Sequence, residues 1–103
     1  MEQAVQNKAT LLSRLQANGS KLRSYGVLNL RLFGSFLTGH THAESDIDLL
    51  VEFHPHQKNY DNFIDLSFFL EELLGRKVEV ITEQSLNKYI GPHILSNAEY
   101  VSF

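Results

Sequence analysis

Apolar residues recur every three or four positions at the start of the chain. This spacing is typical of one face of an amphipathic helix, and it predicts a helix from Glu2 to Ala17. The apolar positions of this face are Val5, Ala9, Leu12 and Leu15. Asn18-Gly19 ends the pattern. Ser20 is then expected to cap a shorter helix that ends near Gly26, since glycine adopts the left-handed conformation at helix ends.

Apolar and polar residues alternate or mix at short spacing in three later segments, which predicts β-strands. These are Val27 to Phe33, Ile47 to Phe53 and Lys77 to Ile81. The first strand ends at Gly34-Ser35. Phe36 to Glu44 is expected to form a short helix or turn followed by a loop.

The second half of the chain begins with a loop and continues with a long helix. Residues 54–62 are polar and contain Pro55, which favours a loop. A helical stripe follows at Phe63, Leu66, Leu70, Leu73 and Leu74, and Gly75 ends it. Phe68 lies on the same helix and widens its apolar arc beyond one face.

The last segment is predicted to be helical with a final strand. Thr82 is expected to cap a helix that breaks at Gly91-Pro92, where Pro92 begins a last short helix. Tyr100 to Phe103 is expected to add an edge strand. Strands separated by helices favour an α/β (α+β) sandwich with a small mixed sheet.

Composition limits the domain count and the classes of function. The chain has 103 residues, of which 43% are hydrophobic, so residues 1–103 are expected to form a single domain. The net charge is −3, without a basic run, so no DNA or RNA binding is expected. Because there is no cysteine, no secretory signal and no apolar run of about 20 residues, we expect a cytoplasmic protein without a membrane segment.

Two aspartates open the second strand. Asp46 and Asp48 lie two positions apart, so in a strand they share one face and stand about 6.5–7 Å apart along the backbone. Carboxylates grouped among apolar residues are costly without a cation. Mg²⁺ prefers carboxylate oxygen and leaves coordination positions for phosphate, and two such ions can stabilise an in-line phosphoryl displacement.

Gly34-Ser35, ten residues before Asp46, can bind phosphate. Glycine lets the backbone approach a ligand, and the first amides of the following turn attract anions. A third acid would complete a second metal site. Glu79 is the candidate, because it lies in an apolar strand between Val78 and Val80, which face the opposite way.

This arrangement resembles the DNA polymerase β-like nucleotidyltransferase superfamily, and within it the minimal nucleotidyltransferases of prokaryotes. The motifs are LRLFGS, SDIDLLVEF and LLGRKVEVIT. The resemblance implies the polymerase β-like fold, with Gly34, Ser35, Thr38 and Ser45 in the nucleotide site. It also implies that Asp46, Asp48 and Glu79 are catalytic acids that hold the metals, with two Mg²⁺ ions, or Mn²⁺, as cofactors.

Two positions depart from the family pattern. Members often have arginine where this chain has Thr38, and a guanidinium grips phosphate well. The third acid is commonly aspartate, where this chain has Glu79. These departures leave open a weakly active or inactive member.

Each of these candidate residues also has a purely structural interpretation. Asp46 and Asp48 could lie on a solvent face, Gly34-Ser35 could be only a turn with a cap, and Glu79 could be an exposed strand acid. The histidine pairs His40/His42 and His54/His56 lack the helical spacing of a zinc motif, so we expect them in exposed loops.

The resemblance implies a metal-dependent enzyme that transfers a nucleoside monophosphate, with ATP the expected donor, to an acceptor hydroxyl. It further implies a helical HEPN-type toxin partner whose tyrosine accepts the group, which gives an antitoxin role. The alternative is an inactive domain that neutralises its partner by binding. Antibiotic or RNA substrates are disfavoured, and assembly of several copies is left open.

Overall fold

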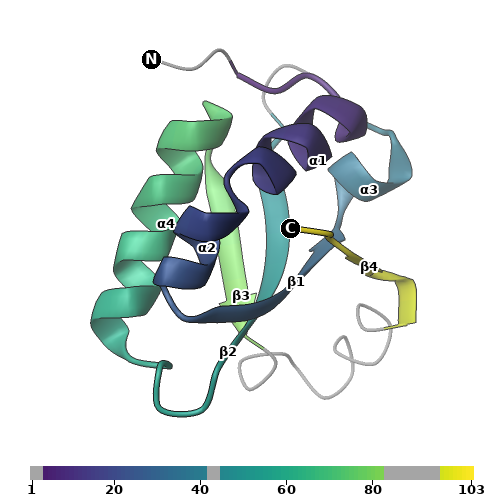
Figure 1. The fold of residues 1–103 in the computed structure, drawn as a ribbon. Coiled ribbons are helices and arrows are strands. Elements are labelled where there is room, and N and C mark those ends of the chain that lie inside the picture. Colours follow the sequence, from purple (N-terminus) through teal and green to yellow (C-terminus); the bar gives the residue numbers. More distant parts are fainter. Residues whose placement is uncertain (1–3, 42–44, 83–95) are drawn as a thin grey trace.

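The computed structural model describes residues 4–41, 45–82 and 96–103. A four-stranded sheet lies behind a layer of helices, with α4 beside α1 and α2, and α3 lies at one end of the sheet (Figure 1). In chain order the elements are α1 (Lys8–Ala17), α2 (Gly19–Ser24), β1 (Val27–Phe33), α3 (Ser35–Thr38), β2 (Ile47–Phe53), α4 (Tyr60–Leu74), β3 (Val78–Thr82) and β4 (Glu99–Tyr100). This mixed sheet with helices confirms the predicted fold class.

The sheet has the strand order β3-β2-β1-β4. β1 pairs antiparallel with both β2 and β4, whereas β2 pairs parallel with β3. The parallel pair needs a crossover, which α4 supplies between β2 and β3. As a result β2 lies inside the sheet, with its first residues next to the end of β1 and the start of β3.

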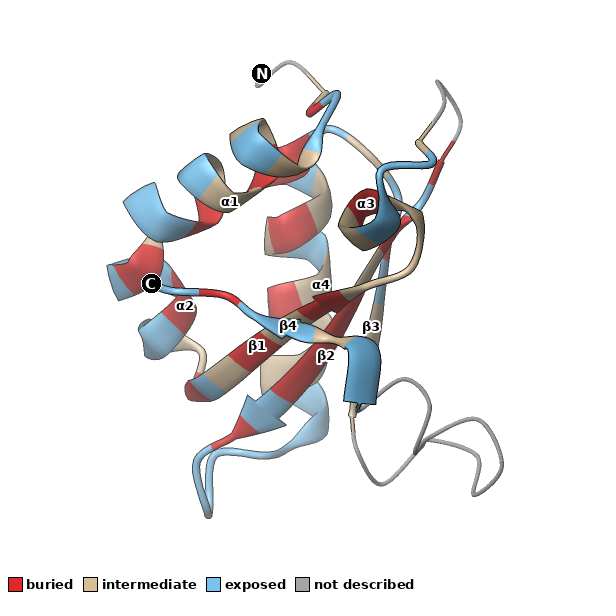
Figure 2. Ribbon diagram, turned by 90° about the vertical axis from the view of Figure 1, so that its right-hand side faces the viewer, coloured by how far each residue is buried: buried red, intermediate tan, exposed pale blue. Residues whose placement is uncertain are grey.

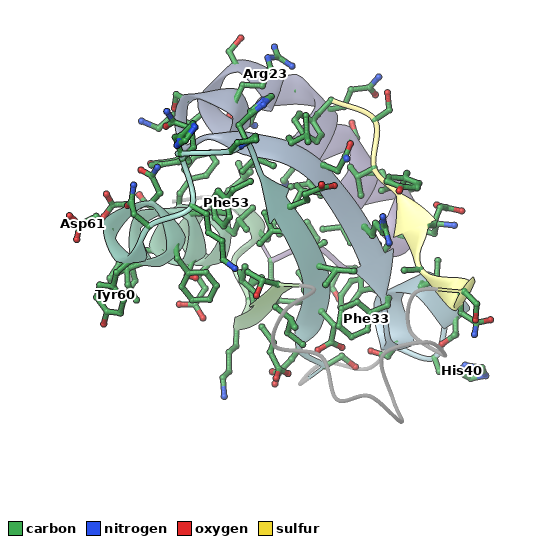
Figure 3. All side chains as sticks on the ribbon, turned by 90° about the horizontal axis from the view of Figure 1, so that it is seen from below. Arg23, Phe33, His40, Phe53, Tyr60 and Asp61 are labelled. Carbon is green, nitrogen blue, oxygen red and sulfur yellow. The ribbon has the colours of Figure 1, made fainter. Side chains whose placement is uncertain are left out.

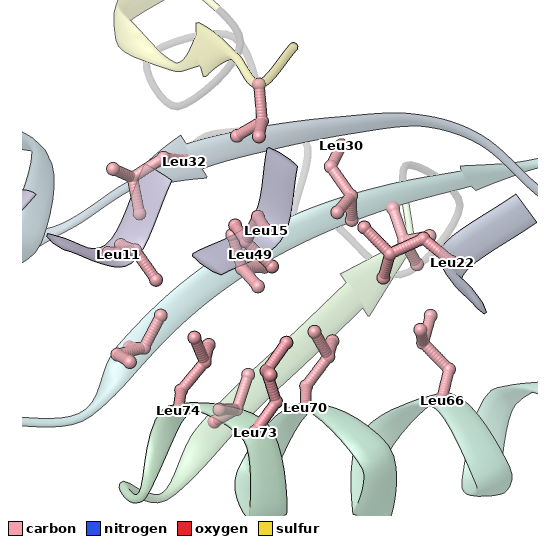
Figure 4. Close-up of a cluster of buried hydrophobic side chains, with 14 of the residues drawn as sticks. Leu11, Leu15, Leu22, Leu30, Leu32, Leu49, Leu66, Leu70, Leu73 and Leu74 are labelled. Atoms are coloured by element: carbon pink, nitrogen blue, oxygen red, sulfur yellow. The ribbon is translucent and has the colours of Figure 1, made fainter. Parts of the chain in front are cut away.

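The hydrophobic core lies between the sheet and the helices. Leucines of α4 project toward those of β1 and β2 (Figure 4), and the buried positions follow the inner face of each element (Figure 2). Among the fully buried side chains are Leu11, Leu15, Leu22, Leu30, Leu32, Ile47, Leu49, Leu66, Leu70 and Leu74. Burial of each such side chain stabilises the fold by about 1.5–3 kcal/mol before entropy is counted.

The first helix begins later than predicted. Asn7 is the N-cap of α1, and its side chain accepts a hydrogen bond from the Thr10 amide at 2.9 Å. Val5 is buried as its apolar pattern indicates, but its backbone N–H donates to Leu74 O at 3.0 Å. Residues 4–7 are therefore not helical, because a tertiary hydrogen bond takes the place of the helical one.

Three further boundaries differ from the sequence prediction. Ser20 lies inside α2 rather than capping it, since Asn18 holds the N-cap position. The long helix begins at Tyr60, because the Asn59 side chain accepts from the Asn62 amide at 2.8 Å. β3 is shifted by one residue toward the C-terminus and includes Thr82.

β1 and β2 have the predicted bounds, and left-handed Gly75 ends α4 as predicted. The predicted edge strand forms, but as β4 it covers Glu99–Tyr100 and not Tyr100 to Phe103. The helices predicted after Thr82 and at Gly91-Pro92 lie outside the described residues. Within the described parts of the chain, no helix is both long enough and apolar enough to cross a membrane.

Candidate active site

One row of residues crosses the sheet on the face turned away from the helices. Asp48 of β2 pairs with Phe33 of β1 on one side and with Glu79 of β3 on the other. The neighbours of Asp48 in β2, Ile47 and Leu49, belong to the helix-facing core. Because side chains alternate along a strand, Asp48 and Glu79 lie on the opposite face of the sheet. Figure 3 labels Phe33, the partner of Asp48 in β1.

Asp48 and Glu79 are close enough to share a proton. The pKa of Asp48 is raised from 3.8 to about 6, first because burial disfavours its charge, then because of the charge and hydrogen bond of Glu79, and last because of the charge of Asp46. Grouped carboxylates resist simultaneous ionisation. A divalent cation that displaced this proton would remove the repulsion.

Gly34 forms the corner beside this pair. Its backbone has φ 77° and ψ −157°, a region that is essentially restricted to glycine. A Cβ atom at this position would overlap Asp48 Oδ2 and would stand 3.0 Å from Asp48 Cγ. The turn therefore requires glycine for its conformation and for the space that the Asp48 carboxylate occupies.

The short helix α3 begins directly after this corner. Its first backbone hydrogen bonds run from the amides of Leu37 and Thr38 to Gly34 O. The amides of Ser35 and Phe36 precede these bonds, so they point out of the first turn as donors. Thr38 is exposed, and its hydroxyl lies 3.0 Å from His40 Nδ1.

Asp46 lies directly before the first residue of β2, beside a pocket of about 280 Å³. Asp46 is exposed, whereas Ser45, directly before it, is 7% exposed. The pocket is lined by Ala4, Gln6, Ser45, Asp46, Gly75, Arg76 and Lys77. Sequence reasoning missed Arg76 and Lys77, which directly precede β3.

The histidines that the structure describes are exposed, as expected: His40, His54 and His56. His42 and His93 lie outside the described residues.

The acidic side chains have the oxygen donors that a hard divalent cation prefers. Burial first, and then the charges of Glu79 and Asp46, raise the pKa of Asp48, and a bound cation would offset both effects. Among residues 4–41, 45–82 and 96–103, however, no three carboxylate or imidazole groups lie close enough together to form a ready-made metal centre. The residues fit a metal if Asp46 turns toward the Asp48–Glu79 pair.

Solved structures share this fold. A protein described as a minimal nucleotidyltransferase is 30% identical, with a TM-score of 0.80, over 93% of this chain and 97% of that chain. A toxin–antitoxin structure with AMP-PNP is 19% identical, with a TM-score of 0.65, over 93% of this chain and 73% of that chain, and at that identity it shows the fold alone.

Sequence comparisons identify the family. A family model described as a nucleotidyltransferase domain matches residues 13–101. The protein adenylyltransferase MntA of Thermococcus cleftensis is 36% identical over 90 residues, which cover 86% of this chain and 90% of that protein. The resemblance to minimal nucleotidyltransferases is thus confirmed, and the chain belongs to the nucleotidyltransferase domain family as an enzyme of the transferase class.

Proposed function

We propose that this chain transfers AMP from ATP to a tyrosine hydroxyl of a helical toxin partner of the HEPN type, and so acts as an antitoxin. The observation that carries the proposal is the contact of three elements at one point: the Gly34 corner, Asp48 and Glu79. A relative at 36% identity is named a protein adenylyltransferase, which supports a protein acceptor. We also place the protein in the cytoplasm, as one domain over residues 1–103.

The triphosphate would lie over the corner that Gly34 and Ser35 form. The Gly34 Cα has no side chain, so the phosphates can approach the backbone there. The Ser35 hydroxyl and the first amides of α3 would donate to phosphate oxygens. Thr38 and Ser45 flank this position, at the end of α3 and directly before Asp46.

Asp46, Asp48 and Glu79 would hold divalent metal, with two Mg²⁺ ions expected and Mn²⁺ as a substitute. Bound there, the metal would neutralise the polyphosphate charge and activate the acceptor hydroxyl. The pKa of Asp48 is about 6, so the carboxyl is mostly ionised at neutral pH and could bind a cation without losing a proton.

The acceptor would approach from the side of β3. β3 is an edge strand of the four-stranded sheet, and Glu79 is exposed on it. The tyrosine oxygen would form a bond to the α-phosphorus of ATP and lose its proton, while the bond from that phosphorus to the β-bridging oxygen breaks. Pyrophosphate leaves, and the tyrosine carries AMP.

The second candidate function is a binding module with an inactive site. Thr38, in place of the arginine that family members often have, and Glu79, in place of aspartate, are the features that favour it. The fold shared with a toxin–antitoxin structure fits either function.

Incubation with α-labelled ATP, Mg²⁺ and the product of the neighbouring gene distinguishes the two. The enzyme should label the partner, and the double change Asp46→Asn with Asp48→Asn should abolish labelling. If the wild type binds the partner without labelling it, and the double variant binds it equally well, the domain is a binding module.

A further inference from the structure

Arg76 lies between the long helix and the strand of the third acid. It follows Gly75, whose left-handed conformation (φ 67°) ends α4, and it comes two residues before Val78 begins β3. The Arg76 side chain is partly buried. A partly buried guanidinium needs fixed partners for its donors, so its contacts show which segments it connects.

The guanidinium of Arg76 contacts three separate segments. Its Nε donates to Val5 O at 2.6 Å, and its Nη1 donates to Ser45 O at 3.1 Å. Its carbon centre lies 5.2 Å from the centroid of the Phe36 ring, at the distance of a cation–π contact. Two backbone carbonyls and a buried ring are rigid partners, so each contact restrains a segment of chain.

Two of these segments belong to the candidate site. Ser45 comes directly before Asp46, and Phe36 comes directly after Ser35 in α3. The amide of Ile47 donates to Lys77 O at 3.0 Å, which extends the pairing of β2 and β3 up to the residue next to Arg76. One side chain thus restrains the segment that carries Asp46 and the turn that carries Ser35.

We propose that Arg76 is a positioning residue that holds Asp46 and the α3 turn in place for binding of a metal–nucleotide complex. The inference rests on the proposed function of the site. Arg76 has no role in the chemistry. It acts through Ser45 and Phe36, and it fixes the distance between an acid that holds metal and a turn that holds phosphate.

The role requires a guanidinium. Arginine presents a planar fork of donors and a flat face to one environment, whereas lysine offers a single ammonium. In this structure the fork serves Val5 O and Ser45 O, while its carbon centre lies over Phe36. Lysine could replace one of these contacts but not all three.

Arg14 of α1 provides a matched control. Its Nη1 donates to Leu73 O at 3.1 Å, so it also joins a helix to a backbone carbonyl at the end of α4. Loss of this bond should therefore lower stability without a specific effect on the site.

The experiment compares Arg76→Met, Arg76→Lys and Arg14→Met with the wild type, well below their melting temperatures. Calorimetry measures binding of Mn²⁺ with a non-hydrolysable ATP analogue, and hydrogen exchange follows the Ile47 amide. We expect Arg76→Met to weaken binding at least tenfold and to speed exchange at Ile47. Arg76→Lys should weaken binding less, and Arg14→Met should change neither measurement more than twofold.

Two outcomes would contradict the proposal in different ways. If Arg76→Met and Arg76→Lys bind the complex within twofold of the wild type, Arg76 only stabilises the fold. If the wild type itself binds no Mn²⁺ with the analogue, the proposed function fails and the positioning role fails with it.

Discussion

The two faces of the seven-residue strand β2 differ in their effect on stability: one is apolar and buried, and the other carries a carboxylate of the candidate site. On the helix side, Ile47, Leu49, Val51 and Phe53 are buried against the core. On the other side, Asp48 lies beside Glu79, and burial together with the Glu79 charge raises the pKa of Asp48 to about 6. Apolar burial on the helix side stabilises the fold. On the opposite side, the partly buried Asp48 beside Glu79 lowers stability when its carboxylate is ionised. A strand that alternates in this way lets the core hold carboxylates at a spacing that they would not adopt alone.

The outer face is not uniformly polar. Leu50, between Asp48 and Glu52, is 2% exposed, although it is not part of the helix-side core. The contrast between the faces is therefore sharpest at the row of Asp48 and Glu79 and is weaker farther along the strand.

The helix side should show the largest effect on stability. Leu49→Ala removes a fully buried side chain and should lower the free energy of unfolding by about 3 kcal/mol. Urea denaturation measures this change. Leu28→Ala in β1, where Leu28 is 39% exposed, is the control and should cost less than about 1 kcal/mol. Equal losses at both positions would mean that the helix side is not the core.

On the outer face, replacing Asp48 should raise the free energy of unfolding at neutral pH, whereas Leu49→Ala lowers it. Because the pKa of Asp48 is raised in the folded state, the folded chain binds this proton more tightly than the unfolded chain. Its contribution to stability is fully present below pH 3.8 and is lost as the pH rises through about 6; since Asp48 is only partly buried, solvent screening limits the loss to roughly 1–2 kcal/mol.

Asp48→Asn should remove that pH dependence. The difference in unfolding free energy between the variant and the metal-free wild type should move in favour of the variant as the pH rises from 3.8 through about 6, and it should stay constant once Asp48 is fully ionised, about one pH unit higher. Urea denaturation across this range checks the prediction. A variant that is less stable than the wild type at pH 7 would give Asp48 a structural role.

The smallest effect is expected at the exposed end of α3. Thr38→Arg restores the guanidinium that related enzymes often carry, and it should lower KM for ATP a few-fold, or by about 1 kcal/mol, through added hydrogen bonds to phosphate. Thr38 is exposed, so the melting temperature should change little. Thr38→Lys is the control for charge alone. A KM that does not change would place Thr38 away from the triphosphate.

Local patterns predicted the elements that hold the proposed site. The bounds of β1 and β2 followed from alternation, and the end of α4 followed from Gly75. Val78 and Val80 indicated which face of β3 is apolar, and so placed Glu79 on the other face. The structure adds that Glu79 pairs there with Asp48. Roles at the site were inferred from resemblance and remain proposals.

Other features depend on contacts between distant backbone groups. Val5 fitted a helical stripe, but its amide bonds to Leu74 O, and no side-chain pattern reveals such a bond. Arg76 escaped selection for the same reason, since its hydrogen bonds to Val5 and Ser45 go to carbonyl oxygens that every residue type has. The start of α4 was missed because polar residues fill its first turn after the Asn59 cap.

The register of β2 against β3 has a consequence for quality control during folding. β1 holds β2 in place, so a slip of one residue would flip β3 alone, turning Glu79 toward the helices and exposing Val78 and Val80 to water. An unpaired carboxylate buried against the core would cost roughly several kcal/mol, on top of the lost apolar contacts. A molecule with the wrong pairing would therefore be unstable as well as inactive, so the population that survives folding should consist of molecules whose acids are correctly aligned.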